Sequence, residues 1–118
     1  MRHSTEYRQT GGVHSAALAD DTGLVVFRDD LGRHNAIDKV IGAALTAGIG
    51  FADKVMLTSG RISSEIVWKL IRCGIPVLAS AKAPTDQAVR IARDGHLTTV
   101  GFARVSRMNI YSGTERIE

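Results

Sequence analysis

Four short segments of this chain combine a basic side chain with glycine, serine or threonine: residues 29–35, 59–63, 81–85 and 103–107. Glycine lets a backbone approach a ligand closely, and arginine and lysine form charge-assisted hydrogen bonds with phosphate oxygens. For one segment alone, a helix cap beside a solvated charge is the simpler interpretation. Four such segments favour a site for an anionic organic phosphate.

The first segment opens a run that is dense in functional groups. A helix expected to start near Asn35 places Asp38 and Lys39 in its first turn. An acidic residue is favourable there and a lysine is not, so Lys39 is expected to have an anionic partner. Asp38 could equally be an ordinary first-turn carboxylate, and Asp30 could accept ligand hydroxyls or a guanine edge, or orient Arg33. The candidate binding residues of this run are Asp30, Gly32, Arg33, His34, Asn35, Asp38 and Lys39.

The second segment is the best candidate for a phosphate cradle. Ser59, Gly60 and Arg61 run directly into Ser63 and Ser64, where the next helix is expected to begin. Unpaired N–H groups at a helix N-terminus favour anions. The spacing is not that of a Walker motif, so the pattern is weak on its own. Arg104 supplies the cation of the last segment.

The elements that must position these segments alternate between strand and helix. Apolar β-branched runs predict strands at residues 24–28, 54–58, 75–80, 97–102 and 108–111. Helical spacing predicts helices at 35–47 and 63–72, and a third from Pro84, in its first turn, to Gly95. Ser63 and Ser64 are the N-cap candidates of the second helix, and Gly74 is expected to close it. Residues 11–19 could form a further helix. This order predicts an α/β fold with a mostly parallel or mixed central sheet and helices on both faces, hence three layers. Ligands of such sheets bind at the carboxyl ends of the strands, where all four segments fall.

Composition excludes several classes of protein. The 118 residues suit one domain, expected to span residues 1–118. A net charge of +3 with 5% aromatic residues is too little for a nucleic-acid binder, so no nucleic-acid partner is expected. The apolar runs are too short to span a membrane, and the polar N-terminus is not a signal peptide. A cytoplasmic protein without a membrane partner is therefore expected.

Histidine and cysteine could in principle hold zinc, but the pattern argues against it. A zinc deaminase would carry His-x-Glu and Pro-Cys-x-x-Cys, whereas Ala16 stands two residues after His14 and Cys73 is the one cysteine. No zinc or other metal site is expected. His14 could contact a ligand or serve as a capping or packing residue, and Cys73 is expected to be a small buried residue. Trp68 and Met56 are expected in the core.

Several motifs resemble the FdhD family of formate dehydrogenase accessory proteins. They are Thr-Gly-Gly-Val-His-Ser-Ala-Ala-Leu from Thr10, Asp-Leu-Gly-Arg-His-Asn-Ala-Ile-Asp-Lys from Asp30, Ser-Gly-Arg from Ser59, Gly-Ile-Pro-Val-Leu-Ala-Ser from Gly74, Ala-Pro-Thr from Ala83, and Gly-Phe-Ala-Arg from Gly101. The resemblance implies a cytidine-deaminase-like fold without zinc chemistry. It also implies binding of the molybdenum cofactor in its bis-guanine-dinucleotide form, with GDP as a mimic. The partners implied are a cysteine desulfurase, formate dehydrogenase and a second copy of the chain.

One departure from the family limits what the resemblance implies. Family members carry an earlier segment with a Cys-x-x-Cys loop that transfers sulfur, and this sequence has no such loop. The chain is therefore expected to correspond to the C-terminal domain of an FdhD-like sulfurtransferase and to bind the cofactor without transferring sulfur by itself. The alternatives are a deaminase-like nucleotide hydrolase, which would need zinc, and a non-catalytic dimerisation module.

Overall fold

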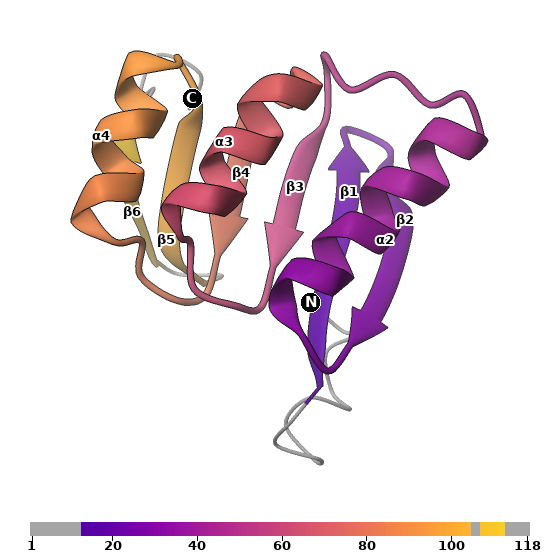
Figure 1. Cartoon of the computed structure of the whole chain (residues 1–118), viewed down its shortest axis with the longest axis horizontal. Coiled ribbons are helices and arrows are strands. Elements are labelled where there is room, and N and C mark those ends of the chain that lie inside the picture. The colour runs from indigo at the N-terminus through magenta and orange to yellow at the C-terminus, as the bar shows by residue number, and fades with distance from the viewer. Residues whose placement is uncertain (1–12, 105–106, 113–118) are drawn as a thin grey trace.

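The computed structural model describes residues 13–104 and 107–112, which form one mixed sheet covered by helices (Figure 1). The strands are β1 (His14–Asp20), β2 (Gly23–Asp30), β3 (Val55–Thr58), β4 (Val77–Ser80), β5 (Thr98–Arg104) and β6 (Arg107–Ser112). The helices are α2 (Arg33–Thr46), α3 (Ser64–Cys73) and α4 (Asp86–Asp94). The order of the strands in the sheet is β2-β1-β3-β4-β5-β6.

The sheet is parallel at its centre and antiparallel at both sides. β3, β4 and β5 run parallel, while β1 is antiparallel to β2 and β3, and β6 is antiparallel to β5. The crossover helices α2, α3 and α4 all lie on the same face (Figure 1). The prediction of an α/β fold with a mixed sheet is confirmed. Of the three expected layers, the described part of the chain shows two.

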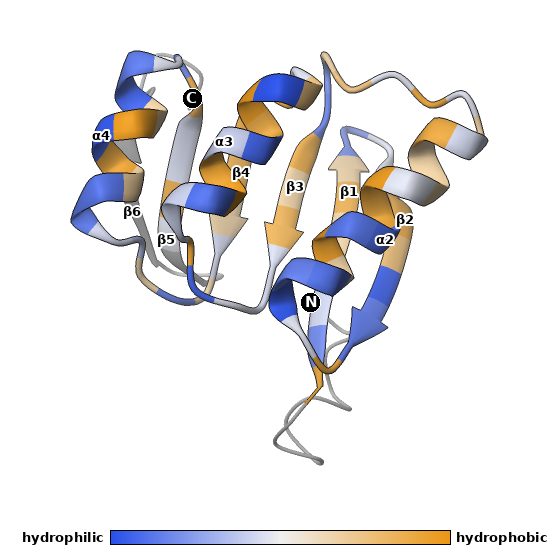
Figure 2. Ribbon diagram, in the orientation of Figure 1, coloured by the Kyte–Doolittle hydropathy of each residue, from blue (hydrophilic) through white to orange (hydrophobic). Residues whose placement is uncertain are grey.

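The core fills the space between the sheet and this helical layer. Strand residues such as Leu18, Met56 and Leu78 alternate with residues that face the other side, and they pack against helix residues such as Ile37 and Ile66. Burying one such aliphatic side chain stabilises the fold by about 1.5–3 kcal/mol. Figure 2 shows the hydrophobic residues along β3 and the helices, whereas the end of β2 and the start of α2 are hydrophilic.

The helix considered for residues 11–19 is wrong over its described part, because His14–Asp20 is the strand β1. Alanine favours helices in isolation, but here Ala16, Ala17 and Leu18 are fully buried in a strand between β2 and β3. Pairing on both edges and burial on both faces outweigh a helix propensity worth only tenths of a kcal/mol per residue. The correction moves His14 from an expected helix start to the beginning of a strand.

The starts of two helices also differ from expectation. α2 begins at Arg33, two residues earlier than predicted, so Asp38 and Lys39 lie beyond the first turn. α4 is capped by Thr85, whose side chain accepts a hydrogen bond from the Ala88 amide, so Pro84 precedes the helix. The caps of α3 agree with the prediction: Ser63 accepts from the Ile66 amide, and Gly74 ends the helix at φ +78°.

Two residues expected in the core have different positions in the structure. Met56 is fully buried, as predicted, but the side chain of Trp68 is 52% exposed on the outer side of α3. Its neighbours Ile66, Val67 and Leu70 fill the inner side of that helix. The buried face of α3 is thus formed by these three aliphatic residues, and Trp68 lies outside it.

Candidate functional site

The candidate site is the edge of the sheet at which β2, β3 and β4 end. His14 joins this edge because β1 runs antiparallel to its neighbours, which pairs His14 with Asp30 in the register. Thr58 and Ser80, the last residues of β3 and β4, are register partners in the parallel pairing of these two strands. We call this region the strand-end edge, formed by His14, Asp30, Arg33, Ser59, Gly60, Arg61, Ser80 and Lys82.

Hydrogen bonds from serine hydroxyls and backbone amides hold β1, β2 and β3 together at this edge. The Ser15 amide donates to Ser59 Oγ (2.9 Å), and the Ser59 amide donates to the Ser15 carbonyl (3.0 Å). The Ser15 hydroxyl donates to Asp29 Oδ1 at 2.6 Å. Ser59 is thereby fixed beyond the end of its strand, so the following Gly60 starts from a defined position.

Gly60 and Arg33 are in close contact. A Cβ added at Gly60 would lie 2.7 Å from Arg33 Cβ and 2.8 Å from Arg33 Cδ, closer than carbon atoms can approach. Only glycine therefore lets the Arg33 side chain lie across this turn. Arg33 Nε is buried and has no hydrogen-bond partner among the described residues. An unsatisfied buried donor is unfavourable, and an anionic acceptor would relieve that cost.

His14 lies beside two cations. Its burial, together with the positive charges of Arg33 and Lys82, lowers the pKa of His14 below the ordinary 6.5. Burial and these two charges, which come from α2 and from the loop after β4, favour the neutral form of the imidazole. An anion bound among these groups would oppose their effect and raise the pKa of His14.

Asp30 and Lys39 pair with each other. Lys39 Nζ lies 2.7 Å from Asp30 Oδ2 and also donates to the Asp29 carbonyl at 3.2 Å. The Gly32 amide donates to Asp30 Oδ1 at 3.0 Å, and the Asn35 side chain also hydrogen-bonds this carboxylate. The Lys39 hydrogen bond, followed by that of the Gly32 amide, lowers the pKa of Asp30 to about 2. The expected anionic partner of Lys39 is thus Asp30, which organises the turn into α2.

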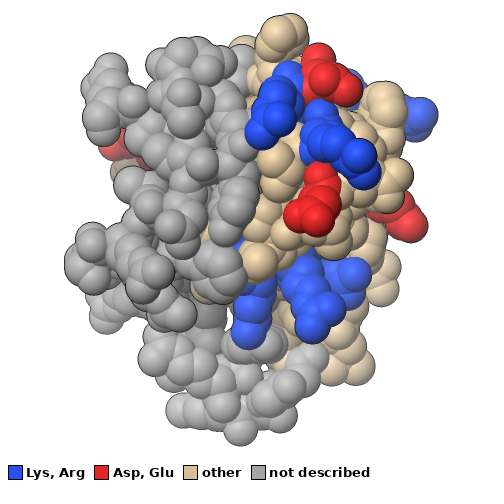
Figure 3. Space-filling model, turned by 90° about the vertical axis from the view of Figure 1, so that its left-hand side faces the viewer, with Lys and Arg blue, Asp and Glu red and all other residues tan. Residues whose placement is uncertain are grey.

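Within residues 13–104 and 107–112, the cations of the strand-end edge have no acidic partner, whereas the other three described lysines each have one. Lys39, Lys54 and Lys69 each pair with at least one aspartate. Arg33, Arg61 and Lys82 form no ion pair with any described residue. On the face shown in Figure 3, basic side chains gather towards the lower part, and basic and acidic side chains alternate higher up.

The structure brings some of the predicted site residues together and separates others. Asp38 pairs with Lys69 of α3 and so joins the helical layer. His34 and Asn35 lie in the first turn of α2, half-buried and exposed respectively. Arg104 ends β5 at the same edge as the parallel strands, but its side chain lies outside the described residues.

Four residues at or beside the strand-end edge were not among the predicted site residues: Ser15, Asp29, Ser80 and Lys82. Lys82 belongs to one of the four basic segments, so its spacing was a usable signal. Ser15, Asp29 and Ser80 also lie within the segments and motifs described above, but their contacts depend on how the strands pair, which the sequence does not reveal.

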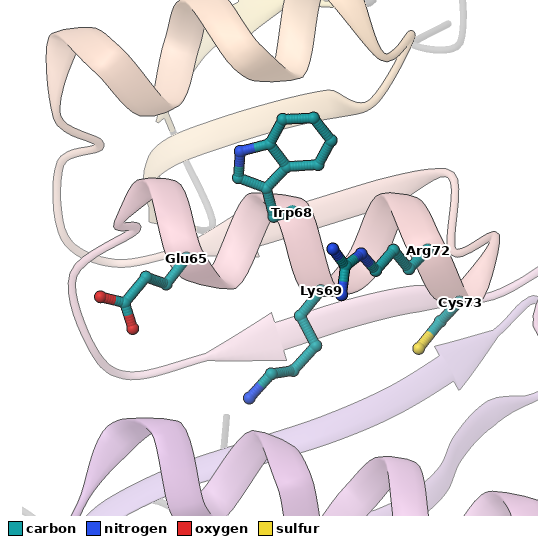
Figure 4. A pocket seen from close by; sticks show the side chains of 5 residues that line it. All are labelled: Glu65, Trp68, Lys69, Arg72 and Cys73. Carbon is teal, nitrogen blue, oxygen red and sulfur yellow. The ribbon is translucent and has the colours of Figure 1, made fainter.

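A separate hollow lies along the outer side of α3, from Glu65 in its first turn to Cys73 at its end. It measures about 500 Å³ and is lined by Glu65, Trp68, Lys69, Arg72 and Cys73 (Figure 4). Trp68 and Lys69 point in opposite directions from the helix, and Lys69 reaches towards Asp38 of α2. Cys73 is half-buried, and burial raises the pKa of its thiol, which makes it a poor nucleophile.

Two negative findings apply to the described part of the chain. Residues 13–104 and 107–112 contain no group of three or more histidine, cysteine, aspartate or glutamate side chains placed to hold a metal ion. None of the described helices is both long and apolar enough to cross a membrane.

Comparison with known proteins gives a consistent family match. The model of the FdhD/NarQ family matches residues 1–118. The sulfur carrier protein FdhD of Listeria monocytogenes is 47% identical over 116 residues, which are 98% of this chain and 44% of that protein. FdhD of Shouchella clausii is 48% identical over 118 residues, 100% of this chain and 44% of that protein. This chain thus spans less than half the length of these curated relatives.

Solved structures agree with the sequence matches. A crystal structure from Desulfotalea psychrophila, described as a formate dehydrogenase accessory protein, superimposes with a TM-score of 0.91. It is 34% identical and covers 99% of this chain and 53% of its own. A second crystal structure, from Thermotoga maritima, is described as a diaminohydroxyphosphoribosylaminopyrimidine deaminase/5-amino-6-(5-phosphoribosylamino)uracil reductase. It has a TM-score of 0.60 at 12% identity and covers 75% of this chain and 29% of its own. The second likeness shows the deaminase-like fold alone.

Proposed function

Because this chain belongs to the FdhD/NarQ family, we propose that it is the cofactor-binding domain of a sulfur carrier that serves formate dehydrogenase. The ligand proposed is the guanine-dinucleotide form of the molybdenum cofactor, with GDP as its mimic. This cofactor is the substrate that a sulfur carrier would modify, and its pyrophosphates are the groups that an array of cations can recognise.

The observation that carries the proposal is the group of cations at the strand-end edge that have no acidic partner among the described residues. Arg33 and Arg61 can donate several hydrogen bonds to phosphate oxygens, and Lys82 adds a third positive charge. Arg33 Nε is buried without an acceptor among the described residues, and Gly60 leaves room for the Arg33 side chain to lie across the turn. A charged group that is held in place before binding loses little entropy when the ligand arrives.

Other candidate residues fit the remainder of such a ligand. His34, Asn35 and Gly32 lie beside Arg33 at the start of α2, where backbone N–H groups favour an anion. Arg104 stands at the same edge through the backbone of β5. Asp30 keeps its pairing with Lys39 and supports this turn.

The surroundings of His14 argue against the deaminase alternative. A zinc ligand needs a site that tolerates a divalent cation, whereas His14 lies beside Arg33 and Lys82. Two adjacent positive charges would oppose a third.

Sulfur transfer is not proposed for the residues of this chain. Cys73 is the last residue of α3, while the strand-end edge lies at the first turn of that helix. At 1.5 Å per residue, roughly 14 Å of helix separates them. A cysteine desulfurase, formate dehydrogenase and a second copy of the chain stay as proposed partners of the sulfur carrier. The cytoplasmic location suggested by composition also stays part of the proposal.

Calorimetric titration with GDP tests the proposed ligand. Arg61→Ala removes an exposed cation of the strand-end edge, and Arg93→Ala removes an exposed cation of α4. A charge-assisted hydrogen bond contributes ~1.5–3 kcal/mol, so Arg61→Ala should weaken binding about tenfold or more. Arg93→Ala should leave the affinity unchanged. Equal affinities in the two variants, or no binding by the unaltered chain, would contradict the proposal.

A further inference from the structure

Ser80 links the two loops that carry most of the strand-end edge. It is the last residue of β4 and is only 2% exposed. Its hydroxyl donates to the Gly60 carbonyl at 2.6 Å and accepts from the Lys82 amide at 3.0 Å. One buried oxygen therefore contacts the loop after β3 and the loop after β4.

The two loops need such a link because their backbones separate at this point. The ladder between β3 and β4 ends at the pair Thr58–Ser80, and pairing resumes at the bridge between Ile62 and Pro84. At that bridge the Ile62 amide donates to the Ala83 carbonyl (3.4 Å), and the Thr85 amide donates to the Ile62 carbonyl (3.0 Å). The Ser80 hydroxyl spans the gap between the end of the ladder and the bridge.

All three cations of the edge depend on the residues that Ser80 holds. Arg61 follows Gly60 directly in the chain, and the side chain of Arg33 lies across Gly60. Lys82 is held through its own amide. Three like charges repel one another, so their loops would separate unless a neutral contact kept them together.

We propose that Ser80 is the positioning residue of the anion site, which locks the loops after β3 and β4 into one rigid cradle. This inference rests on the proposed function for its ligand and adds a residue that does not touch that ligand. A binding site whose charges are fixed by a second set of contacts binds more tightly than one that must be assembled by the ligand.

Binding measurements on three variants test the role of the hydroxyl. Ser80→Ala should weaken the affinity for GDP about tenfold, because two loop contacts are lost together. Ser80→Thr keeps the hydroxyl and should restore most of the affinity. Thr99→Val removes another buried hydroxyl, from β5, and should leave GDP binding unchanged even where it lowers stability.

Hydrogen exchange without ligand gives a second readout. In Ser80→Ala, the amides of Ile62, Lys82 and Thr85 should exchange faster, while those inside β3 and β4 should keep their protection. Unchanged exchange in both loops, or unchanged GDP affinity in Ser80→Ala when the unaltered chain binds normally, would overturn the inference about Ser80. If the unaltered chain fails to bind GDP while Ser80→Ala loosens both loops, the proposed ligand is wrong and the loop linkage stands.

Discussion

The strand-end edge and the hollow on α3 differ in shape and in charge. The difference shows that a concave surface is not by itself the best candidate for a binding site. The hollow is concave and carries a half-exposed tryptophan, but its Lys69 is already paired with Asp38. Arg72 is then its one cation without an ion pair among the described residues, and Glu65 also lines the hollow.

The edge gathers three cations, Arg33, Arg61 and Lys82, that pair with no acidic side chain in the part of the chain that the structure describes. Neutralising a charge within the fold removes most of its attraction for a ligand. The edge is therefore the better candidate for an anion.

The largest expected effect comes from closing the space beneath Arg33. Gly60→Ala places a Cβ within 3 Å of Arg33 Cβ, which is attached to the helix backbone and cannot move far. Overpacking of this kind should lower the free energy of unfolding by about 1–3 kcal/mol. It should also weaken GDP binding by more than tenfold, because Arg33 is displaced. Thermal unfolding and calorimetry measure the two effects.

The control for that variant is Gly42→Ala on the exposed side of α2, where nothing lies within 4 Å of the added Cβ. Alanine should stabilise this helix by about 1 kcal/mol relative to glycine and leave GDP binding intact. If Gly60→Ala changes stability and GDP affinity no more than Gly42→Ala does, the contact between Gly60 and Arg33 is not needed for binding.

A direct comparison of the two regions uses one cation from each. Lys82→Ala should weaken GDP binding about tenfold, because a charge facing the ligand is lost. Arg72→Ala, which removes a cation from the α3 hollow, should change the affinity less than twofold. A larger loss of affinity in Arg72→Ala than in Lys82→Ala would indicate that the anion binds in the hollow.

The pH dependence of binding tests the place of His14. Burial and the charges of Arg33 and Lys82 lower its pKa, so the unfolded chain takes up a proton at a higher pH than the folded chain. Without ligand, stability should therefore fall as the pH drops below about 6.5. A bound anion raises the pKa of His14, so GDP binding should take up protons and tighten severalfold between pH 7.5 and 6. His14→Asn, measured in parallel, separates this effect from protonation of GDP itself and should flatten it.

The smallest expected effect lies in the helical layer. Asp38→Ala breaks the partly exposed pair with Lys69 and should lower the free energy of unfolding by only ~0.2–1 kcal/mol. GDP affinity should stay within twofold of that of the unaltered chain. A tenfold loss of affinity would show that Asp38 contacts the ligand, as its position in the motif first suggested.

The sequence predicted the features that depend on local pattern. Ser63 and Gly74 delimit α3 as expected, because caps are set by a few neighbouring residues. The strands around Met56 and Leu78 were found because apolar runs bounded by turns identify them. The cluster of basic segments followed from one topological rule, that parallel strands end at a common edge.

The features that were missed depend on contacts between distant residues. Ala16 and Ala17 belong to a strand because β2 and β3 flank them, which no local propensity reveals. The pairing of Asp38 with Lys69, 31 residues away, has no signal in the local sequence. The role of Ser80 follows from the meeting of Gly60 and Lys82 around one hydroxyl.

The side-chain nitrogen of Arg33 tests the central claim most directly, since it is buried and has no acceptor among the described residues. In a nitrogen-15 spectrum of the arginine Nε–H groups, GDP should shift the Arg33 signal and slow its exchange with water. The signals of Arg72 and Arg93 should stay in place. An unmoved Arg33 signal while an arginine of α3 or α4 shifts would contradict the assignment of the anion site to the strand-end edge.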